Sequence, residues 1–334
     1  MRKFRAAVVG CGVAGSLVDA KGPTPLPQSH AGMYASDPRF ELVAACDSDV
    51  GRLRAFETTW KPRHVCRDIA EMFERTGPRE LDVVSISTPT DTHAELLNAV
   101  LESSVSVVVL EKPVARSVRE ADPLRGQLSN KRTKVLVNYQ RRWSTNFIRL
   151  VQHVRESRLG EIVRAQINYP IGIVHSGSHG IDLLRWMFGP PQWVQALNAL
   201  ESGVSDGVVD CALGWAGGLR AYLQGFARRP WNIFELDLLG TAGRVRVTNG
   251  GRDMEFYAVD VDRDYPHLRG FVPVEAPFPN EWQSAYLNLA DHVVELLERP
   301  ERQPRCSFSD GYEALRVAEA AVVSAHENSR RIDL

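Results

Sequence analysis

The sequence predicts an α/β protein in which an N-terminal doubly wound parallel sheet of the Rossmann type precedes a C-terminal α+β domain with a large, mostly antiparallel open sheet. Three observations lead to this fold class. Short valine-rich runs alternate with helix-like segments over residues 1–140, a glycine-rich turn follows the first run, and strand-like segments joined by turn residues follow residue 140. We therefore expect domains at 1–140 and 141–334, with the last helices as candidates to pack back on the first domain.

Five short apolar runs in the first domain have the pattern of parallel strands. Each is nearly continuous in apolar residues, as is typical of strands buried on both faces. Helix-like segments near 49–59, 68–75, 91–102 and 117–129 lie between them, so the connections are expected to be right-handed crossovers. The expected strands are Phe4–Val9, Glu41–Cys46, Asp82–Ile86, Val105–Leu110 and Lys134–Val137.

One stretch near the N-terminus breaks this alternation. The segment Gly22–Pro27 contains three prolines, which no regular helix tolerates. We interpret Asp19–Gln28 as a loop inserted after the first helical turn. Helix is expected to resume near Ser29, whose hydroxyl can cap it.

The second domain shows consecutive hairpin patterns between helices. A helix is expected around Ser144–Ser157, and two more near Glu281–Glu298 and Gly311–Asn328 close the chain. Asp310 followed by Glu313 has the spacing of a capping box for the last helix. The expected hairpins pair Val208–Trp215 with Leu219–Phe226 across Ala216–Gly218, and Phe234–Leu239 with Arg244–Val247 across Gly240–Gly243, and a third turn begins at Asn249-Gly250.

The composition excludes several classes of function. Forty basic and 41 acidic residues give a net charge of −1, which argues against a broad basic face for nucleic acid or an anionic membrane. No apolar run reaches the roughly 18 residues that a membrane helix needs. The five cysteines are scattered without a C-x-x-C pair, so neither a disulfide framework nor a metal site is expected, and a cytoplasmic location fits best. The uncharged run Ala6–Val18 has some features of a secretory signal, but a glycine turn explains it better.

The glycine-rich turn has the spacing of a dinucleotide-binding loop. Gly10-Cys11-Gly12-Val13-Ala14-Gly15 is a G-x-G-x-x-G that follows the first strand and opens a helix. In such a loop the first glycine allows the tight turn, the second lets the backbone approach a pyrophosphate, and the third lets helix and strand pack closely. The free N–H groups at the helix start then face the anion.

An acidic residue at the end of the second strand supports the same function. Asp47 can accept hydrogen bonds from the adenosine ribose, and with Asp49 it would repel a 2′-phosphate, so NAD is expected over NADP. Asp47 lies 32 positions after Gly15, farther than the usual 20 or so, and the proline-rich loop can supply the excess. An aspartate that only caps the next helix is the alternative, and Arg52 is the residue that could favour NADP.

Two further motifs lie where parallel strands are expected to end. They are Ser87-Thr88-Pro89-Thr90-Asp91-Thr92-His93 and Glu111-Lys112-Pro113. Open α/β sheets bind their ligands at this edge, so a lysine there can present its ammonium next to a nicotinamide. The alternative for the second motif is an exposed loop ion pair.

Together these motifs resemble the glucose–fructose oxidoreductase / inositol dehydrogenase / MocA family of NAD(P)-dependent oxidoreductases. The resemblance covers nearly the whole chain and continues through Gly177-Ser-His179-Gly-Ile-Asp182 and the following residues to Gly189, through Gly240–Gly243, and to the helix around Ala314–Ala325. It implies that Lys112 contacts nicotinamide and substrate and that His179 is the acid/base. The expected cofactor-binding residues are Gly10, Cys11, Gly12, Val13, Ala14, Gly15, Asp47, Ser87, Thr88, Pro89, His93, Glu111 and Lys112.

The chain departs from the family pattern beside the expected base. Many members carry an aspartate four residues before this histidine, and here the position is His175. Either Asp182 does part of this work or the substrate differs from a neutral polyol. We place His179 in the first turn of a helix and His175 in the loop before it. The expected substrate-binding residues are Lys112, Tyr139, Arg141, Arg142, His175 and His179; the arginines suit an anionic group, and a helix-entry salt bridge is the alternative for each.

The sequence thus predicts an NAD-dependent oxidoreductase acting on a secondary hydroxyl or ketone of a sugar or cyclitol, with a nucleotide sugar or other anionic sugar as the preferred class. Oxidation needs a hydride acceptor, a base and a cation near the developing alkoxide, and His179 and Lys112 can supply the last two. Two alternatives stay open: an NAD-using glycosidase acting by transient oxidation and elimination, and a non-catalytic sugar- and NAD-binding regulator. The resemblance also implies a homodimer or homotetramer formed through the sheet of the second domain.

Overall fold

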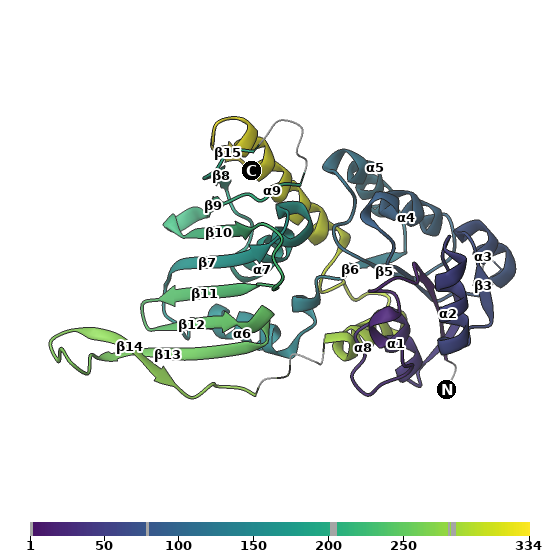
Figure 1. Cartoon of the computed structure of the whole chain (residues 1–334), viewed down its shortest axis with the longest axis horizontal. Coiled ribbons are helices and arrows are strands. Elements are labelled where there is room, and N and C mark those ends of the chain that lie inside the picture. The colour runs from purple at the N-terminus through teal and green to yellow at the C-terminus, as the bar shows by residue number, and fades with distance from the viewer. Residues whose placement is uncertain (1–2, 78–79, 201–205, 280, 282–284) are drawn as a thin grey trace. The chain divides into compact units, whose positions relative to one another are not determined.

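The computed structural model describes residues 3–77, 80–200, 206–279, 281 and 285–334. The chain divides into two compact units (Figure 1). The first comprises Met1–Ser144 and Gln283–Tyr312, and the second comprises Thr145–Trp282 and Glu313–Leu334. The segment Gln283–Tyr312, which the sequence assigned to the second domain, therefore belongs to the first unit.

The first unit contains a parallel sheet of six strands in the order β3-β2-β1-β4-β5-β6. The predicted doubly wound sheet is confirmed, since the strand order changes direction between β1 and β4. A strand of three residues, β3, was not predicted. The strands are β1 (Phe4–Val9), β2 (Phe40–Cys46), β3 (His64–Cys66), β4 (Val83–Ile86), β5 (Val107–Leu110) and β6 (Lys134–Val137).

Four helices of this unit, α1, α2, α3 and α5, begin at side-chain caps. Ser29, Asp49, Asp68 and Ser117 each accept a backbone N–H from the first turn, which satisfies a donor that has no partner within the helix. α1 packs on β2 and on α8, and α4 packs on α5. The helices are α1 (His30–Ser36), α2 (Val50–Trp60), α3 (Ile69–Thr76), α4 (His93–Leu101), α5 (Val118–Leu128) and α8 (Ala285–Glu298), with short 3₁₀ turns at Leu17–Asp19, Thr90–Thr92 and Gln140–Arg142.

The proline-rich segment is looped out of a helix that otherwise continues across it. The N–H of His30 donates to the carbonyl of Ala14 at 3.1 Å, and the N–H of Ala31 donates to that of Gly15 at 2.8 Å. In an uninterrupted helix Val18 would donate to Ala14, so His30 stands 12 positions later than that donor. Subtracting these 12 positions from the 32 between Gly15 and Asp47 leaves 20, the usual separation. The insertion therefore accounts for the long spacing.

The second unit is built on a mixed sheet of nine strands in the order β14-β13-β12-β11-β7-β10-β9-β8-β15. The pairing is antiparallel except between β7 and β10, and both predicted hairpins are present as β9–β10 and β11–β12. The strands are β7 (Ile162–Pro170), β8 (Trp193–Ala196), β9 (Cys211–Gly214), β10 (Arg220–Phe226), β11 (Glu235–Gly240), β12 (Gly243–Thr248), β13 (Asp253–Val261), β14 (Arg269–Val274) and β15 (Ile332–Asp333).

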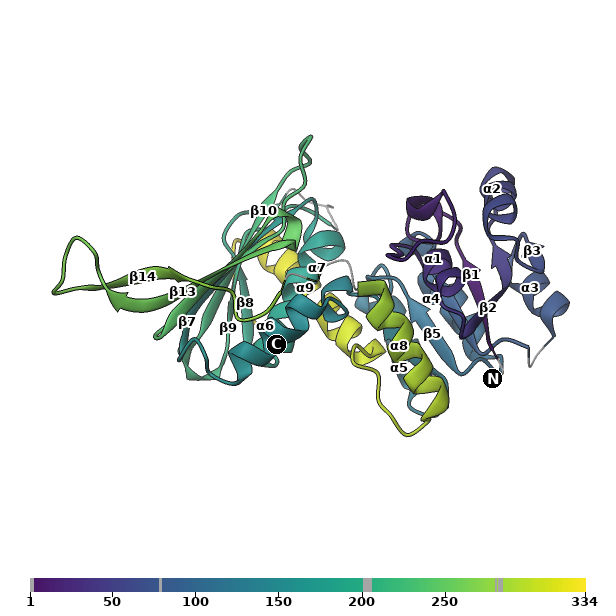
Figure 2. The ribbon, with the colours of Figure 1, turned by 90° about the horizontal axis from the view of Figure 1, so that it is seen from below.

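Helices cover one face of this sheet, as Figure 2 shows for α6 (Thr145–Arg155) and α7 (Ser178–Phe188). The backbone of Gly180 lies against Ile167 of β7, which brings α7 close to the sheet. Along β11 buried and part-exposed residues alternate, as expected when one face is covered and the other is open.

The last helix, α9 (Phe308–His326), begins earlier than predicted. The capping box joins Ser307 to Asp310: the Asp310 carboxylate accepts the N–H of Ser307 at 2.8 Å, and the Ser307 hydroxyl accepts the N–H of Asp310 at 3.2 Å. The predicted Asp310–Glu313 box was wrong, because Glu313 pairs with Arg316 instead. Within the described residues, no helix is both long and apolar enough to cross a membrane.

Candidate functional site

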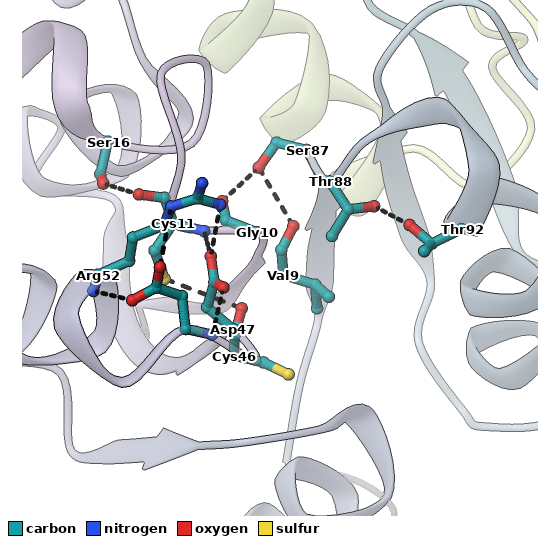
Figure 3. A network of polar contacts seen from close by, with 11 residues as sticks. Val9, Gly10, Cys11, Ser16, Cys46, Asp47, Arg52, Ser87, Thr88 and Thr92 are labelled. Carbon is teal, nitrogen blue, oxygen red and sulfur yellow. Dashed lines mark hydrogen bonds and ion pairs between the residues drawn. The ribbon is translucent and has the colours of Figure 1, made fainter.

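A cavity of about 710 Å³ lies at the carboxyl ends of β1, β2 and β4, where the strand order reverses. This is the edge at which open α/β sheets bind ligands. Figure 3 shows the polar network around its wall. The cavity is lined by Gly10, Gly12, Val13, Asp47, Ser48, Arg52, Arg67, Asp68, Ser87, Thr88 and Pro89, together with Val9, Leu17, Cys46, Ile69, Asp91, Thr92, Glu95 and Leu96.

The three glycines of the loop have different environments. Gly10 adopts a φ of +94°, and a Cβ there would lie 2.6 Å from backbone atoms of Ser87 and Thr88. A Cβ at Gly15 would lie 1.9 Å from the carbonyl oxygen of Gly10. A Cβ at Gly12 would meet nothing nearer than Arg52 at 4.0 Å. Gly10 and Gly15 are thus required by packing, whereas Gly12 leaves open space in the cavity wall that a ligand can approach.

The carboxylate of Asp47 joins the end of β2 to this loop. Its Oδ2 accepts the N–H of Cys11 at 2.7 Å, and its Oδ1 accepts the N–H of Asp49 at 2.9 Å (Figure 3). Asp49, and not Asp47, caps α2. The guanidinium of Arg52 approaches Asp47 and Asp49 at 3.9 and 3.8 Å, contacts too long to be hydrogen bonds. An ionised carboxylate has about four lone-pair sites, so Asp47 can accept further hydrogen bonds.

The loop after β4 is held to the glycine turn and to the segment that follows β5. The Ser87 hydroxyl donates to the carbonyl of Gly10 at 2.8 Å, and the Thr92 hydroxyl donates to the side-chain hydroxyl of Thr88 at 2.7 Å. His93 is buried and does not line the cavity. Its Nε2 lies 2.9 Å from the carbonyl oxygen of Thr88, and its Nδ1 lies 2.7 Å from that of Pro113. His93 therefore connects the cavity wall to the segment that carries Lys112.

The Glu111-Lys112-Pro113 segment follows β5 directly. The Glu111 carboxylate accepts Asn138 Nδ2 at 2.7 Å and lies 3.1 Å from His30 Nε2. Burial acts to raise the pKa of Glu111, but the hydrogen bond from His30, the charge of Lys112 and the hydrogen bond from Asn138 outweigh burial and hold that pKa below its ordinary value. Glu111 is therefore ionised at neutral pH beside Lys112.

The second unit carries the two histidines of the sequence motif. His179 is the second residue of α7 and is part-buried, and His175 is exposed in the turn Ile173–Gly177 that precedes the helix. A carboxylate remote in sequence anchors this turn: Asp206 accepts the N–H of Val174 at 2.7 Å and that of His175 at 3.1 Å. Asp182 lies one turn after His179 and is buried.

The predicted substrate residues that follow β6, Tyr139, Arg141 and Arg142, differ in burial and in their contacts. Arg142 is buried, and its guanidinium donates to the carbonyl of Arg305 at 3.1 Å and to Asp310 at 3.3 Å. This is the helix-entry salt bridge that the sequence left open. Tyr139 is buried and Arg141 is part-exposed.

The structure brings part of the predicted set together at the cavity. Six of the predicted cofactor residues, namely Cys11, Ala14, Gly15, His93, Glu111 and Lys112, do not line it. Lys112 belongs to the first unit and His179 to the second. Sequence reasoning missed His30, Tyr286 and Asp206, whose contacts join positions far apart in the chain.

Two buried cysteines, Cys11 and Cys46, lie in the glycine-rich loop and at the end of β2. Burial raises the pKa of Cys46 to about 12, and burial followed by the charge of Asp47 raises that of Cys11 further, so neither thiol is a nucleophile at neutral pH. Among the described residues no cluster of three His, Cys, Asp or Glu side chains could hold a metal ion.

Comparison with known families gives a match for each domain. Residues 4–139 match the model of an "oxidoreductase family, NAD-binding Rossmann fold", and residues 172–334 match the model of the same family's C-terminal alpha/beta domain. The chain is 23% identical over 378 residues to D-apiose dehydrogenase of Paraburkholderia graminis, covering all of this chain and 90% of that one. It is 25% identical over 271 residues to inositol 2-dehydrogenase of Rhizobium meliloti, covering 74% of this chain and 79% of that one.

Solved structures share the fold at lower identity. The WlbA dehydrogenase of Bordetella pertussis, solved with NADH and UDP-GlcNAcA, superposes with a TM-score of 0.75 at 22% identity, covering 100% of this chain and 99% of that one. A levoglucosan dehydrogenase solved with NADH gives a TM-score of 0.79 at 18% identity, covering 99% of each chain.

Proposed function

Because the chain belongs to the glucose–fructose oxidoreductase / inositol dehydrogenase / MocA oxidoreductase family, with its NAD-binding Rossmann domain, we propose that it transfers a hydride between nicotinamide and a secondary hydroxyl or ketone of a sugar or cyclitol. One observation carries the proposal. The ring nitrogens of His93 lie within hydrogen-bond distance of the carbonyls of Thr88 in the cavity wall and of Pro113 beside Lys112, which supports a place for the lysine near the dinucleotide cavity.

The residues of the cavity fit a dinucleotide. The open space at Gly12 suits close approach of a pyrophosphate, and Asp47 retains acceptor capacity for ribose hydroxyls. When bound, NAD supplies the hydride acceptor for oxidation and NADH the donor for reduction. We propose NAD over NADP because the ionised carboxylates of Asp47 and Asp49 would repel a 2′-phosphate more than Arg52, which lies between them, would attract it.

Two side chains of the protein carry the proton and the charge. In oxidation His179 accepts the proton of the substrate hydroxyl, and in reduction it returns that proton. The ammonium of Lys112 stabilises the negative charge that develops on the same oxygen. Asp206 acts at a distance, since it anchors the turn that leads into His179.

The sequence predicted two arginines, Arg141 and Arg142, as binding residues for an anionic group of the substrate. Arg142 donates to Asp310 and to the carbonyl of Arg305, so the preference for a phosphate or carboxylate on the substrate rests on Arg141, the other predicted arginine. We retain an anionic or nucleotide sugar as the preferred class on that residue. Loss of affinity for anionic sugars alone in Arg141→Gln would support this preference.

We also propose that copies of the chain assemble through the outer face of the nine-stranded sheet. That face carries a small polar hollow of about 110 Å³ with side chains from β7, β11 and β12, among them Asn168, Glu235 and Arg246. Light scattering would test this proposal. If the face is the interface, the larger, charged side chain of Asn168→Arg should disrupt it, and the measured mass should fall to that of a single chain.

The experiment that tests the function is a screen of nucleotide sugars, sugar phosphates and inositols with NAD, read as NADH absorbance. Net NADH production with at least one class is expected. Release of product from a glycoside without net NADH would identify the glycosidase alternative. Tight NADH and sugar binding without turnover across the panel would identify the regulator.

A further inference from the structure

A buried polar cluster lies behind Lys112 in the first unit. His30, the first residue of α1, has a fully buried side chain, and its Nε2 lies 3.1 Å from Oε1 of Glu111. Asn138 donates to the same oxygen at 2.7 Å. His30 occupies this place because the insertion loops out and α1 resumes against Ala14.

The protonation of His30 follows from its two ring nitrogens. Nε2 faces a carboxylate that only accepts, so it carries the proton. Nδ1 is buried and has no hydrogen-bond partner within the described residues. A doubly protonated ring would bury an unsatisfied N–H, which costs more than a buried lone pair, so His30 is the neutral donor and Glu111 the anion.

The groups that face Glu111 come from four directions. They are His30 from α1, Asn138 from the end of β6, Tyr286 from α8 and Lys112 from its own segment. Tyr286 packs edge-on against His30 with ring centroids 5.7 Å apart, and its hydroxyl lies 3.5 Å from Asn138 Nδ2. Burial raises the pKa of Tyr286 strongly, so it remains neutral. The carboxylate therefore faces two neutral donors and one cation.

We propose that His30 is a positioning residue for the reaction: by holding the Glu111 carboxylate ionised and fixed, it keeps Lys112 protonated and in place where the alkoxide develops. The inference rests on the proposed role of Lys112. Without the His30 donor, Glu111 loses a hydrogen bond that offsets the cost of burying its charge. A protonated or displaced Glu111 no longer favours the ammonium of Lys112, which then gives up its proton at lower pH.

The test measures kcat against pH at saturating substrate and NAD, together with the Kd of NADH by fluorescence. His30→Leu should move the alkaline limb of kcat to lower pH by about one unit, the size of a lost neighbouring charge. The Kd of NADH should change by less than about threefold, because His30 does not line the cavity. His30→Gln restores an N–H donor and should recover most of the profile. Glu111→Gln removes the charge without changing the side-chain shape and should reproduce the shift even if His30→Leu does not fold.

The chain offers a matched control in the same unit. His292 of α8 is also buried and lies 3.0 Å from a glutamate, Glu295, and its Nε2 accepts the backbone N–H of Arg305 at 3.0 Å. His292→Leu should leave the alkaline limb in place. An unchanged limb in both His30→Leu and Glu111→Gln, or an equal shift in His292→Leu, would overturn the inference. Normal turnover in Lys112→Ala would contradict the proposed function, because Lys112 would then not stabilise the alkoxide. Loss of turnover in Lys112→Ala together with an unchanged pH profile in His30→Leu would contradict only the positioning role of His30.

Discussion

The carboxylate of Asp47 accepts the backbone N–H of Cys11 at 2.7 Å, which ties the end of β2 to the middle of the glycine-rich loop. The same side chain thus fixes the loop and faces the cavity that the loop forms. Any change at Asp47 acts on both.

Asp47→Ser should raise the affinity for NADP relative to NAD by about tenfold or more, because it removes a charge that would repel a 2′-phosphate. Fluorescence titration with both reduced cofactors measures the ratio. Asp49→Ser keeps a good helix cap and serves as the control for loss of a more exposed charge. Wild-type protein that binds NADPH as tightly as NADH would contradict the basis of this prediction.

Gly12→Ala should weaken cofactor binding by about tenfold or more while the melting temperature stays within about 2 °C, since its Cβ meets no protein atom closer than 4.0 Å. Gly10→Ala should instead lower the free energy of unfolding by about 2 kcal/mol or more, because φ is +94° and the Cβ would touch Ser87 and Thr88. Calorimetry and NADH titration on the two variants separate the roles. Equal affinity in Gly12→Ala and wild type would remove the loop from the pyrophosphate site.

Lys112→Ala should lower kcat by about 10²–10³-fold, the usual effect of losing one donor to a developing oxyanion, with little change in cofactor affinity. Lys112→Arg should also be poor, since a guanidinium has a different shape and keeps its proton. Steady-state kinetics at saturating substrate provide the measurement. Normal turnover in Lys112→Ala would take this residue out of the mechanism.

His179→Ala should lower kcat by about 10²–10⁴-fold and flatten the acidic limb of oxidation, because it removes the base that accepts the hydroxyl proton. His175→Ala should act mainly on KM, and His175→Asp, which restores the commoner family pattern, should extend activity toward neutral polyols. A pH series on the three variants tests this. Loss of the limb in His175→Ala with the limb intact in His179→Ala would mean that the roles are reversed.

Glu111 should contribute a pH-dependent part of the stability. Its pKa in the folded protein lies below the ordinary value of 4.5, so its contribution is present above that pH and is lost as the pH falls through the folded value. Urea midpoints at pH 7 and pH 3.5 should therefore differ less in Glu111→Gln than in the wild type. If the urea midpoint changes by the same amount between pH 7 and pH 3.5 in both proteins, the pKa of Glu111 does not differ between the folded and unfolded states.

The elements that could be predicted from sequence are those with a local cause. The proline run predicts the loop, Ser29 caps the helix as expected, and the valine runs place five of the six parallel strands. The strand His64–Cys66 escaped prediction because three residues show no periodicity. The start of α9 was misplaced because Ser307 and Asp310 form the same capping pattern three residues before Asp310 and Glu313.

The site was predictable only where a motif carries it. Asp47 follows from the end of a strand, but its two backbone partners do not. The pair His30–Glu111 joins positions 81 residues apart, and Asp206 reaches Val174 across 32. Contacts of this range depend on how the strands are ordered, which no local pattern contains. Arg142 is a different case. Its charge predicted that it would bind an anionic substrate group, but it is buried and donates to the carboxylate of Asp310 instead.

The looped-out segment changes how distance along this chain should be counted. Because the helix resumes its ladder at His30, the loop between Ser16 and Ser29 can lengthen or shorten without moving Gly15 relative to Asp47. A motif search that fixes the number of residues between the last glycine and the acid would reject this chain, whereas one that counts hydrogen-bonded positions would accept it. The same loop is a place where an epitope or a short reporter peptide could be inserted, because the hydrogen bonds from His30 to Ala14 and from Ala31 to Gly15 already hold the two flanking segments together.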